Sequence, residues 1–278
     1  HIRTLGFRGE ALPSIGSVSR MNLTSRVTSF DGVIAEDVWA ISVEGGIIEG
    51  PSPAAINHGT KVEIRDLFFA TPARLKFLKT PRTEFNHAVE VVERLAMAHP
   101  NIGFTLGDGS RTPVRLGAAP CDLLDARLSR LGAVIGREFE DNALAIEAER
   151  EGFQLTGYIG LPTMNRRTSS HQFLFVNGRP VRDKLLYGAV RGAYADFVAY
   201  DRHAMVALFL DSPEEAVDVN VHPAKTEVRF REPGLVRGLI VGSLKRALSE
   251  AGHRASSTVS TAALGALGRS TGDRSGMP

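Results

Sequence analysis

A lysine that follows a break between two strand-like segments could contact an anion. Residues 218–222 alternate apolar and polar side chains, as a half-buried strand does. Pro223 interrupts the pattern because it has no backbone N–H to donate to a sheet. Lys225 follows, and an apolar alternation resumes beyond it. Taken alone, this spacing is explained most simply by a solvated lysine on a hairpin-like turn, so the rest of the chain must supply the anion.

Two other stretches could take part in binding a phosphate or a nucleotide. The first is a glycine-flanked turn before a helix-like run, Gly6, Phe7, Arg8, Gly9, Glu10 and Ala11. Glycines before a helix let backbone N–H groups face outward, and the helix N-terminus adds partial positive charge. The second is Thr60, at the entrance of a strand predicted over residues 61–66. Each has a simpler alternative, an ordinary loop-to-helix turn for the first and a turn residue for Thr60.

Basic residues gather in two segments although the net charge of the 278-residue chain is only +2. Residues 65–82 hold five basic residues and one acid, Asp66. Residues 166–191 hold six basic residues and one acid, Asp183; the six are Arg166, Arg167, Arg179, Arg182, Lys184 and Arg191. Any nucleic-acid contact must therefore come from such local patches and not from bulk charge. A solvated rim is the alternative.

The composition is that of a folded, non-membrane protein. Hydrophobic residues make up 43% and charged residues 23% of the chain, enough apolar material for a real core. Cys121 is the only cysteine, which excludes an internal disulfide and a Cys-rich zinc site and fits a cytoplasmic protein. No apolar run approaches the roughly 20 residues of a membrane helix. Walker-type, His-Glu-x-x-His and Cys-x-x-Cys motifs are absent, and we expect no metal site within this chain.

The elements that must position these residues predict an α+β fold. Alternation predicts strands over 17–29, 33–43, 143–147, 153–159 and 204–210, and Asn177-Gly178 predicts a hairpin. Helical spacing follows Thr80-Pro81, Arg182 and Pro233. We predict a first domain over 1–117, a second over 118–251, and a flexible linker over 252–278, where Ser, Thr, Ala and Gly dominate.

Four motifs together resemble the MutL family of DNA mismatch-repair ATPases. They are Leu5-Gly-Phe-Arg-Gly-Glu-Ala-Leu12, Gly59-Thr60 with Thr71-Pro-Ala-Arg74, Phe175-Val-Asn-Gly-Arg179, and Asp218-Val-Asn-Val-His-Pro-Ala-Lys225. The resemblance covers residues 1 to about 250 and looks bacterial. It implies the C-terminal part of a GHKL-type α/β sandwich ATPase domain, followed by a second α/β transducer domain with a mixed sheet and helices.

The resemblance also implies roles for individual residues. Gly6, Phe7, Arg8 and Gly9 match the hinge of the lid over the triphosphate, and Glu10 and Ala11 open the helix behind it. Thr60 matches a late pocket residue near the adenine. Lys225 matches the second-domain lysine that reaches the γ-phosphate, as a stabiliser of charge and not as the group that activates water.

The family's first two motifs are missing from the sequence. They carry the catalytic glutamate, the asparagine that holds Mg²⁺ and the aspartate that reads adenine, and we expect them upstream of His1. The chain then looks like a fragment that is inactive alone, although the intact protein would be an ATPase with ATP and Mg²⁺ as cofactors.

The resemblance further implies a DNA mismatch-repair matchmaker that couples mismatch recognition to strand incision. Its expected partners are DNA, contacted at the backbone without reading sequence, the mismatch-recognition protein MutS, a downstream nuclease or helicase, and a second copy joined in an ATP-dependent dimer. The DNA contacts that we predict are Arg166, Arg167, Arg179, Arg182 and Lys184. Two alternatives stay open: a DNA-binding and docking module without catalysis, and another GHKL ATPase of the gyrase type.

Overall fold

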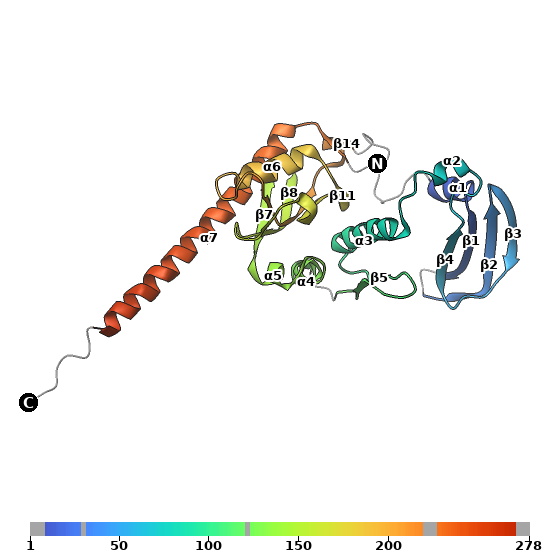
Figure 1. The fold of residues 1–278 in the computed structure, drawn as a ribbon, viewed down its shortest axis with the longest axis horizontal. Coiled ribbons are helices and arrows are strands. Elements are labelled where there is room, and N and C mark those ends of the chain that lie inside the picture. The colour runs from blue at the N-terminus through green and yellow to red at the C-terminus, as the bar shows by residue number, and fades with distance from the viewer. Residues whose placement is uncertain (1–8, 29–31, 120–122, 219–226, 271–278) are drawn as a thin grey trace, which may run out of the picture. The chain divides into compact units, whose positions relative to one another are not determined.

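A computed structural model describes residues 9–28, 32–119, 123–218 and 227–270, with side chains described as far as Gly252 (Figure 1). The chain forms two compact units, residues 1–86 and 87–278. No helix in the described ranges is long and apolar enough to cross a membrane.

The first unit is built on a four-stranded antiparallel sheet with the strand order β3-β2-β1-β4. Its elements are α1 (Ala11–Gly16), β1 (Arg20–Thr28), β2 (Ile34–Glu44), β3 (Ile47–Pro53), β4 (Gly59–Arg65), α2 (Pro72–Leu75) and the start of α3 (Pro81–Ala98). The predicted strands at 17–29, 33–43 and 61–66 are thereby confirmed to within a few residues.

The two faces of this sheet differ in chemistry. Leu23 on β1 lies opposite Ile41 on β2 and Val62 on β4, so these three apolar side chains share one face. Ile41 is 38% exposed and Val62 is 43% exposed. On the opposite face, Arg20 donates to Glu44 at 2.9 Å and to Asp66 at 2.7 Å. One face is therefore an open apolar surface, and the other carries ion pairs.

The second unit contains a five-stranded mixed sheet with the order β11-β10-β13-β8-β7. Only β10 and β13 run parallel. Its elements after α3 are β5 (Phe104–Leu106), β6 (Val114–Leu116), α4 (Leu123–Ile135), α5 (Arg137–Asn142), β7 (Ala143–Arg150), β8 (Phe153–Gly160), β9 (Asn165–Arg166), the 3₁₀ turn η1 (Ser169–His171), β10 (Gln172–Val176), β11 (Arg179–Val181), α6 (Lys184–Tyr194), β12 (His203–Ala204), β13 (Val206–Asp211), the 3₁₀ turn η2 (Glu214–Ala216), β14 (Val217–Asp218), β15 (Arg229–Phe230) and α7 (Pro233–Ser270).

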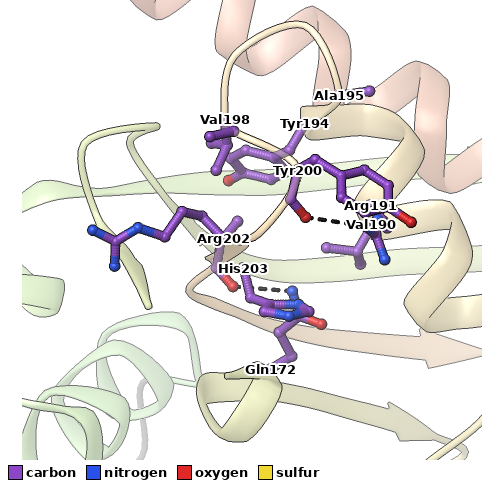
Figure 2. A pocket seen from close by; sticks show the side chains of 11 residues that line it. Gln172, Val190, Arg191, Tyr194, Ala195, Val198, Tyr200, Arg202 and His203 are labelled. Carbon is purple, nitrogen blue, oxygen red and sulfur yellow. Dashed lines mark hydrogen bonds between the residues drawn. The ribbon is translucent and has the colours of Figure 1, made fainter. Parts of the chain in front are cut away.

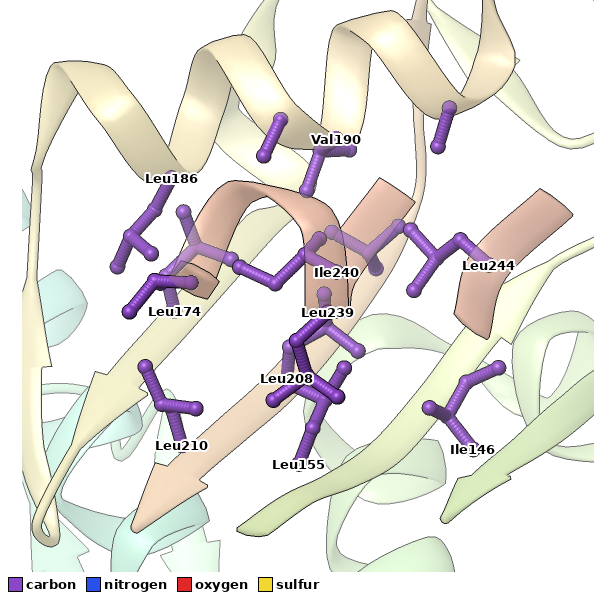
Figure 3. Packing of buried hydrophobic residues seen from close by; sticks show 14 of the residues in the cluster. Ile146, Leu155, Leu174, Leu186, Val190, Leu208, Leu210, Leu239, Ile240 and Leu244 are labelled. Carbon is purple, nitrogen blue, oxygen red and sulfur yellow. The ribbon is translucent and has the colours of Figure 1, made fainter. Parts of the chain in front are cut away.

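Both faces of this sheet are covered, which explains the continuous burial of its central strands. On one face, α6 and α7 pack Val190, Ile240 and Leu244 against Leu155 and other leucines of the sheet (Figure 3). On the other face, α3, α4 and α5 contribute the buried side chains Met97, Leu131 and Phe139. All five side chains of β10 are buried, as expected for a strand covered on both sides.

The predicted hairpin at Asn177-Gly178 is present as a two-residue turn between β10 and β11. Asn177 has φ +47° and Gly178 has φ +73°, the backbone conformation that a tight hairpin turn of this kind requires. Asn177 is fixed further because its carboxamide oxygen accepts a hydrogen bond from the Ser212 N–H at 2.8 Å.

The boundary between compact units lies at Asn86/His87, whereas the sequence predicted a domain boundary after residue 117. The reason is a buried arginine on α4. The Arg130 guanidinium donates to the carbonyl oxygens of Ala96, Pro100, Ile102 and Gly117, at distances of 2.6 to 3.3 Å. These bonds attach residues 96–117 to the second unit.

In the region of the predicted linker over 252–278, α7 continues to Ser270. No proline occurs in this stretch before Pro278, so the helical backbone of α7 continues past the point where the apolar periodicity ends.

Candidate functional site

Four of the predicted phosphate-side residues, Gly6, Phe7, Arg8 and Lys225, lie outside the described residues. The segments that flank Lys225 are described. β14 and β15 pair in antiparallel fashion, with Val217 opposite Phe230. Val228 and Phe230 are each 6% exposed, so the resumed apolar alternation is confirmed. The role of Lys225 stays a prediction.

The described part of the glycine-flanked turn leads directly into α1. Gly9 has φ +64°, no described atom lies within 4 Å of where a Cβ would stand, and Glu10 stands at the N-cap of α1 without a side-chain capping bond. The Glu10 carbonyl accepts from the Ser14 N–H at 3.0 Å. Gly9, Glu10 and Ala11 are all exposed. The predicted loop-to-helix turn is therefore present, and its side chains are free of the core.

Thr60 lies on β4 at the edge of the open apolar face. Its hydroxyl lies 2.8 Å from the Ser25 hydroxyl on β1. Thr60 precedes Val62 by two residues and therefore points to the same face of the sheet. Ser25 in turn lies opposite Trp39, which is 48% exposed. A pair of hydroxyls beside an exposed aromatic and aliphatic surface matches the mix of apolar contact and few polar groups typical of sites for small organic ligands.

The predicted DNA contacts are in the second unit and differ in how they are held. Arg167, Arg182 and Lys184 are exposed, whereas Arg166 and Arg179 are half-buried. Arg182 is paired with Glu90 of α3 at 3.0 Å, and Arg166 lies 4.0 Å from Glu138. Part of the positive charge is thus balanced within the fold, which a count of basic residues along the sequence does not reveal.

A small pocket of about 110 Å³ lies where α6 and the following loop meet the sheet (Figure 2). The buried Tyr194 hydroxyl donates to the Gly160 carbonyl at 2.7 Å, and burial raises its pKa. Gln172 Nε2 donates to the Ala204 carbonyl, and Arg191 donates to the Tyr200 carbonyl and stacks on the Tyr200 ring at 4.0 Å. These polar groups bind one another, so we assign them to holding the loop against the sheet.

No group of three or more His, Cys, Asp or Glu side chains able to hold a metal ion occurs among the residues that the structure describes.

Comparison with known sequences identifies the family. Residues 131–249 match the family model for the DNA mismatch repair protein, C-terminal domain. The chain is 67% identical over 277 residues to the DNA mismatch repair protein MutL of Rhodospirillum rubrum, covering 100% of this chain and 43% of that protein. It is 62% identical over 267 residues to MutL of Paramagnetospirillum magneticum, covering 96% of this chain and 43% of that protein. The chain thus spans less than half the length of these curated relatives.

Solved structures agree with this relationship. The Aquifex aeolicus MutL ATPase domain complexed with ADP is 28% identical and has a TM-score of 0.59, covering 83% of this chain and 76% of that one. The N-terminal domain of a DNA repair protein has the same fold at 22% identity, with a TM-score of 0.72 over 90% of this chain and 77% of that one. The fold is accordingly the C-terminal part of a GHKL-type ATPase domain followed by a second α/β domain with a mixed sheet. The chain belongs to the MutL family of DNA mismatch repair proteins.

Proposed function

We propose that this chain is part of a MutL-type mismatch-repair ATPase that binds and hydrolyses ATP and acts on DNA as a matchmaker between mismatch recognition and strand incision. The observation that carries the proposal is the 67% identity to the Rhodospirillum rubrum MutL across the whole chain. The ADP complex of the Aquifex aeolicus MutL ATPase domain supports an adenine nucleotide as the ligand.

The open apolar face of the first unit is the proposed nucleotide side of its sheet. The described residues fit such a ligand in part, because the hydroxyls of Thr60 and Ser25 lie beside the apolar row of Leu23, Ile41 and Val62. The hydroxyls bind polar groups of the nucleotide, and the apolar row excludes water. Exposed backbone N–H groups near Gly9 face the phosphates, as the family resemblance implies.

Lys225 is the proposed charge-stabilising residue. Bound ATP with Mg²⁺ supplies the phosphoanhydride bond that is hydrolysed. The Lys225 ammonium holds positive charge where the γ-phosphoryl group leaves and thereby stabilises the transition state. No acid of this chain matches the family's catalytic glutamate or its adenine-reading aspartate, and no Asn matches its Mg²⁺ ligand, so we assign none of these roles here.

The proposed partners follow from the family. They are the DNA backbone, MutS, a downstream nuclease or helicase, and a second copy of the protein that associates through its N-terminal region when ATP binds. We place the protein in the cytoplasm, at the nucleoid.

A Lys225→Ala substitution in a full-length protein that carries this chain tests the proposal. We expect the turnover number for ATP hydrolysis to fall about 100-fold, because one preorganised cation at a developing charge contributes on the order of 3 kcal/mol. Nucleotide affinity, measured by fluorescence titration, should change much less.

Lys245→Ala is the matched control, since Lys245 is a partly exposed lysine on α7 that is paired with Asp196, just after α6. Its turnover number should stay at the wild-type value. A Lys225→Ala protein that hydrolyses ATP at the wild-type rate would contradict the assigned role.

The second candidate function is a DNA-binding and docking module without catalysis of its own. The exposed Arg167, Arg182 and Lys184 favour it as an activity of the chain alone. The gyrase-type alternative is not favoured, because the curated relatives at 67% and 62% identity are MutL proteins.

A further inference from the structure

The second unit contains a pocket of about 550 Å³, formed by α3, the start of α6, the turn η1 and β10. Charged side chains converge on it from two elements: Glu90, Glu93 and Arg94 on α3, and Arg182 just before α6. Hydroxyl and imidazole groups also line it, and the end of α4 and β10 add an apolar wall; these residues are His87, Ser169, Ser170, His171, Tyr187, Val134, Ile135 and Phe173. Its residues are separate from the proposed nucleotide face, which lies in the first unit.

Arg94 is the unusual member of this pocket. Its guanidinium carbon lies 4.9 Å from the centre of the Phe173 ring, on a buried wall. Its Nε and Nη1 atoms are buried, and no described group accepts a hydrogen bond from either. Burial, and next the positive charge of Arg182, lower the pKa of Arg94. A half-buried cation with two unmet buried donors, beside a second cation, is costly unless an anion joins them.

Arg182 can bind such an anion if it gives up one weak ion pair, the one with Glu90. Its Nη2 donates to Glu90 Oε2 at 3.0 Å, in a pair whose side chains are 56% and 53% exposed. Exposed pairs of this kind contribute little net stability. Glu90 also lies near a second carboxyl group, that of Glu93. Burial, and next the negative charge of Glu90, raise the pKa of Glu93.

We propose that this pocket binds a phosphoryl group, with Arg94 and Arg182 as its cationic donors and Glu90 as a built-in competitor for Arg182. Guanidinium groups suit this ligand because their planar set of N–H donors matches phosphate oxygens. The Ser170 and Tyr187 hydroxyls line the same pocket and offer further donors.

The phosphoryl group has two possible sources. One is the backbone of DNA, and this source rests on the DNA binding proposed above. The other is free phosphate or a small phosphate ester.

Substitution of the competitor gives the first test. Glu90→Gln keeps the shape of the side chain and removes the charge that holds Arg182. Binding of the 278-residue chain to a fluorescein-labelled DNA duplex is measured by anisotropy, and binding of inorganic phosphate by calorimetry. We expect Glu90→Gln to tighten binding about threefold, the size typical of one partly exposed charge.

Asp196→Asn is the matched control. It also removes one carboxylate from an exposed ion pair of the second unit, with Lys245, and neither residue lines the pocket. It therefore changes the net charge equally, and we expect it to leave both affinities near the wild-type values.

Loss of the donors gives the second test. Arg94→Lys and Arg182→Lys keep the charge but remove the planar donor set, and we expect each to weaken binding about tenfold. Circular dichroism shows whether each variant is folded. Because Arg182 is exposed, Arg182→Lys remains informative even if Arg94→Lys does not fold.

Measuring both DNA and inorganic phosphate distinguishes the two sources of the phosphoryl group. It also distinguishes a failure of the pocket proposal from a failure of the proposed DNA binding. Tighter binding of DNA alone by Glu90→Gln assigns the pocket to the DNA backbone, and tighter binding of phosphate alone assigns it to a free ligand. A wild-type chain that binds phosphate but no DNA would contradict the DNA part of the proposed function and leave the pocket supported. The pocket proposal is overturned if Glu90→Gln matches Asp196→Asn with both ligands, or if folded lysine variants bind both as wild type does.

Discussion

Arg130 is a single buried side chain that holds four backbone carbonyls from a segment with little regular structure. Arg130 is only 4% exposed. Its guanidinium donates to the backbone carbonyl oxygens of Ala96, Pro100, Ile102 and Gly117. Buried carbonyls need donors, and here one charged group donates to all four, two of which belong to the buried residues Ala96 and Pro100. The Pro100 carbonyl also accepts from the Ala119 N–H at 2.9 Å. Residues 96–117 are thus fixed to α4 by hydrogen bonds as well as by the packing of Met97 in the same core as Leu131.

Arg130→Met should therefore destabilise the second unit more than its loss of apolar contact explains. We expect the free energy of unfolding in urea to fall by about 3 kcal/mol, because four hydrogen bonds from a charged donor are lost, two of them to carbonyls of the buried residues Ala96 and Pro100. Lys245→Met, which breaks an exposed ion pair on α7, should cost less than about 1 kcal/mol. Equal losses in the two variants would show that the carbonyls find other partners.

At the scale of elements, β8 depends on one glycine in its middle. Gly157 has φ +132°, and a Cβ atom there would meet the Ala207 carbonyl oxygen on the neighbouring β13. β8 pairs with β13 on one side and with β7 on the other, so neither neighbour can move away without breaking the sheet. Glycine is needed here for both its backbone conformation and its small size.

We expect Gly157→Ala to lower the free energy of unfolding by about 3 kcal/mol or more, as a strained backbone and a steric clash combine. Gly188→Ala on α6 is the control, because nothing lies within 4 Å of the added Cβ atom. That variant should be stabilised by about 1 kcal/mol, the difference in helix propensity. Thermal or urea unfolding measures both, and a neutral Gly157→Ala would mean that β8 can shift.

At the scale of the whole molecule, the first unit leaves one sheet face open while the second unit covers both faces of its own sheet. Ile41, Val62 and Ile64 stay 38% to 43% exposed on the first sheet. The corresponding strands of the second unit are buried under α3 to α7. The nucleotide site proposed for the first unit is therefore an open surface, formed by one face of the sheet.

From this we predict that the 278-residue chain alone binds ATP weakly or not at all. Thr60 and Ser25 supply hydroxyls, but no acid of the chain matches the group that reads the adenine amino group in the family. Isothermal titration calorimetry at millimolar ATP measures this directly, and a full-length protein is the positive control. Binding by the chain at micromolar concentration would contradict the incomplete site and favour a self-contained pocket.

Local sequence determined the features that depend on near neighbours in the chain. The hairpin at Asn177-Gly178, the strands at 153–159 and 204–210 and the helix after Pro233 were all predictable, because turn residues and apolar periods act over a few residues. The family was predictable from four motifs in order. The linker predicted over 252–278 stays a prediction, although the helical backbone of α7 reaches Ser270.

Only the tertiary structure decided which charges meet. The sequence shows Arg94, Arg182 and Glu90 at separations of up to 92 residues, and nothing in their spacing predicts the ion pair or the shared pocket. The same holds for Arg130, whose acceptors lie 13 to 34 residues away and attach residues 96–117 to the second unit. Electrostatic and hydrogen-bond partners depend on distance in space, which folding sets and local pattern does not.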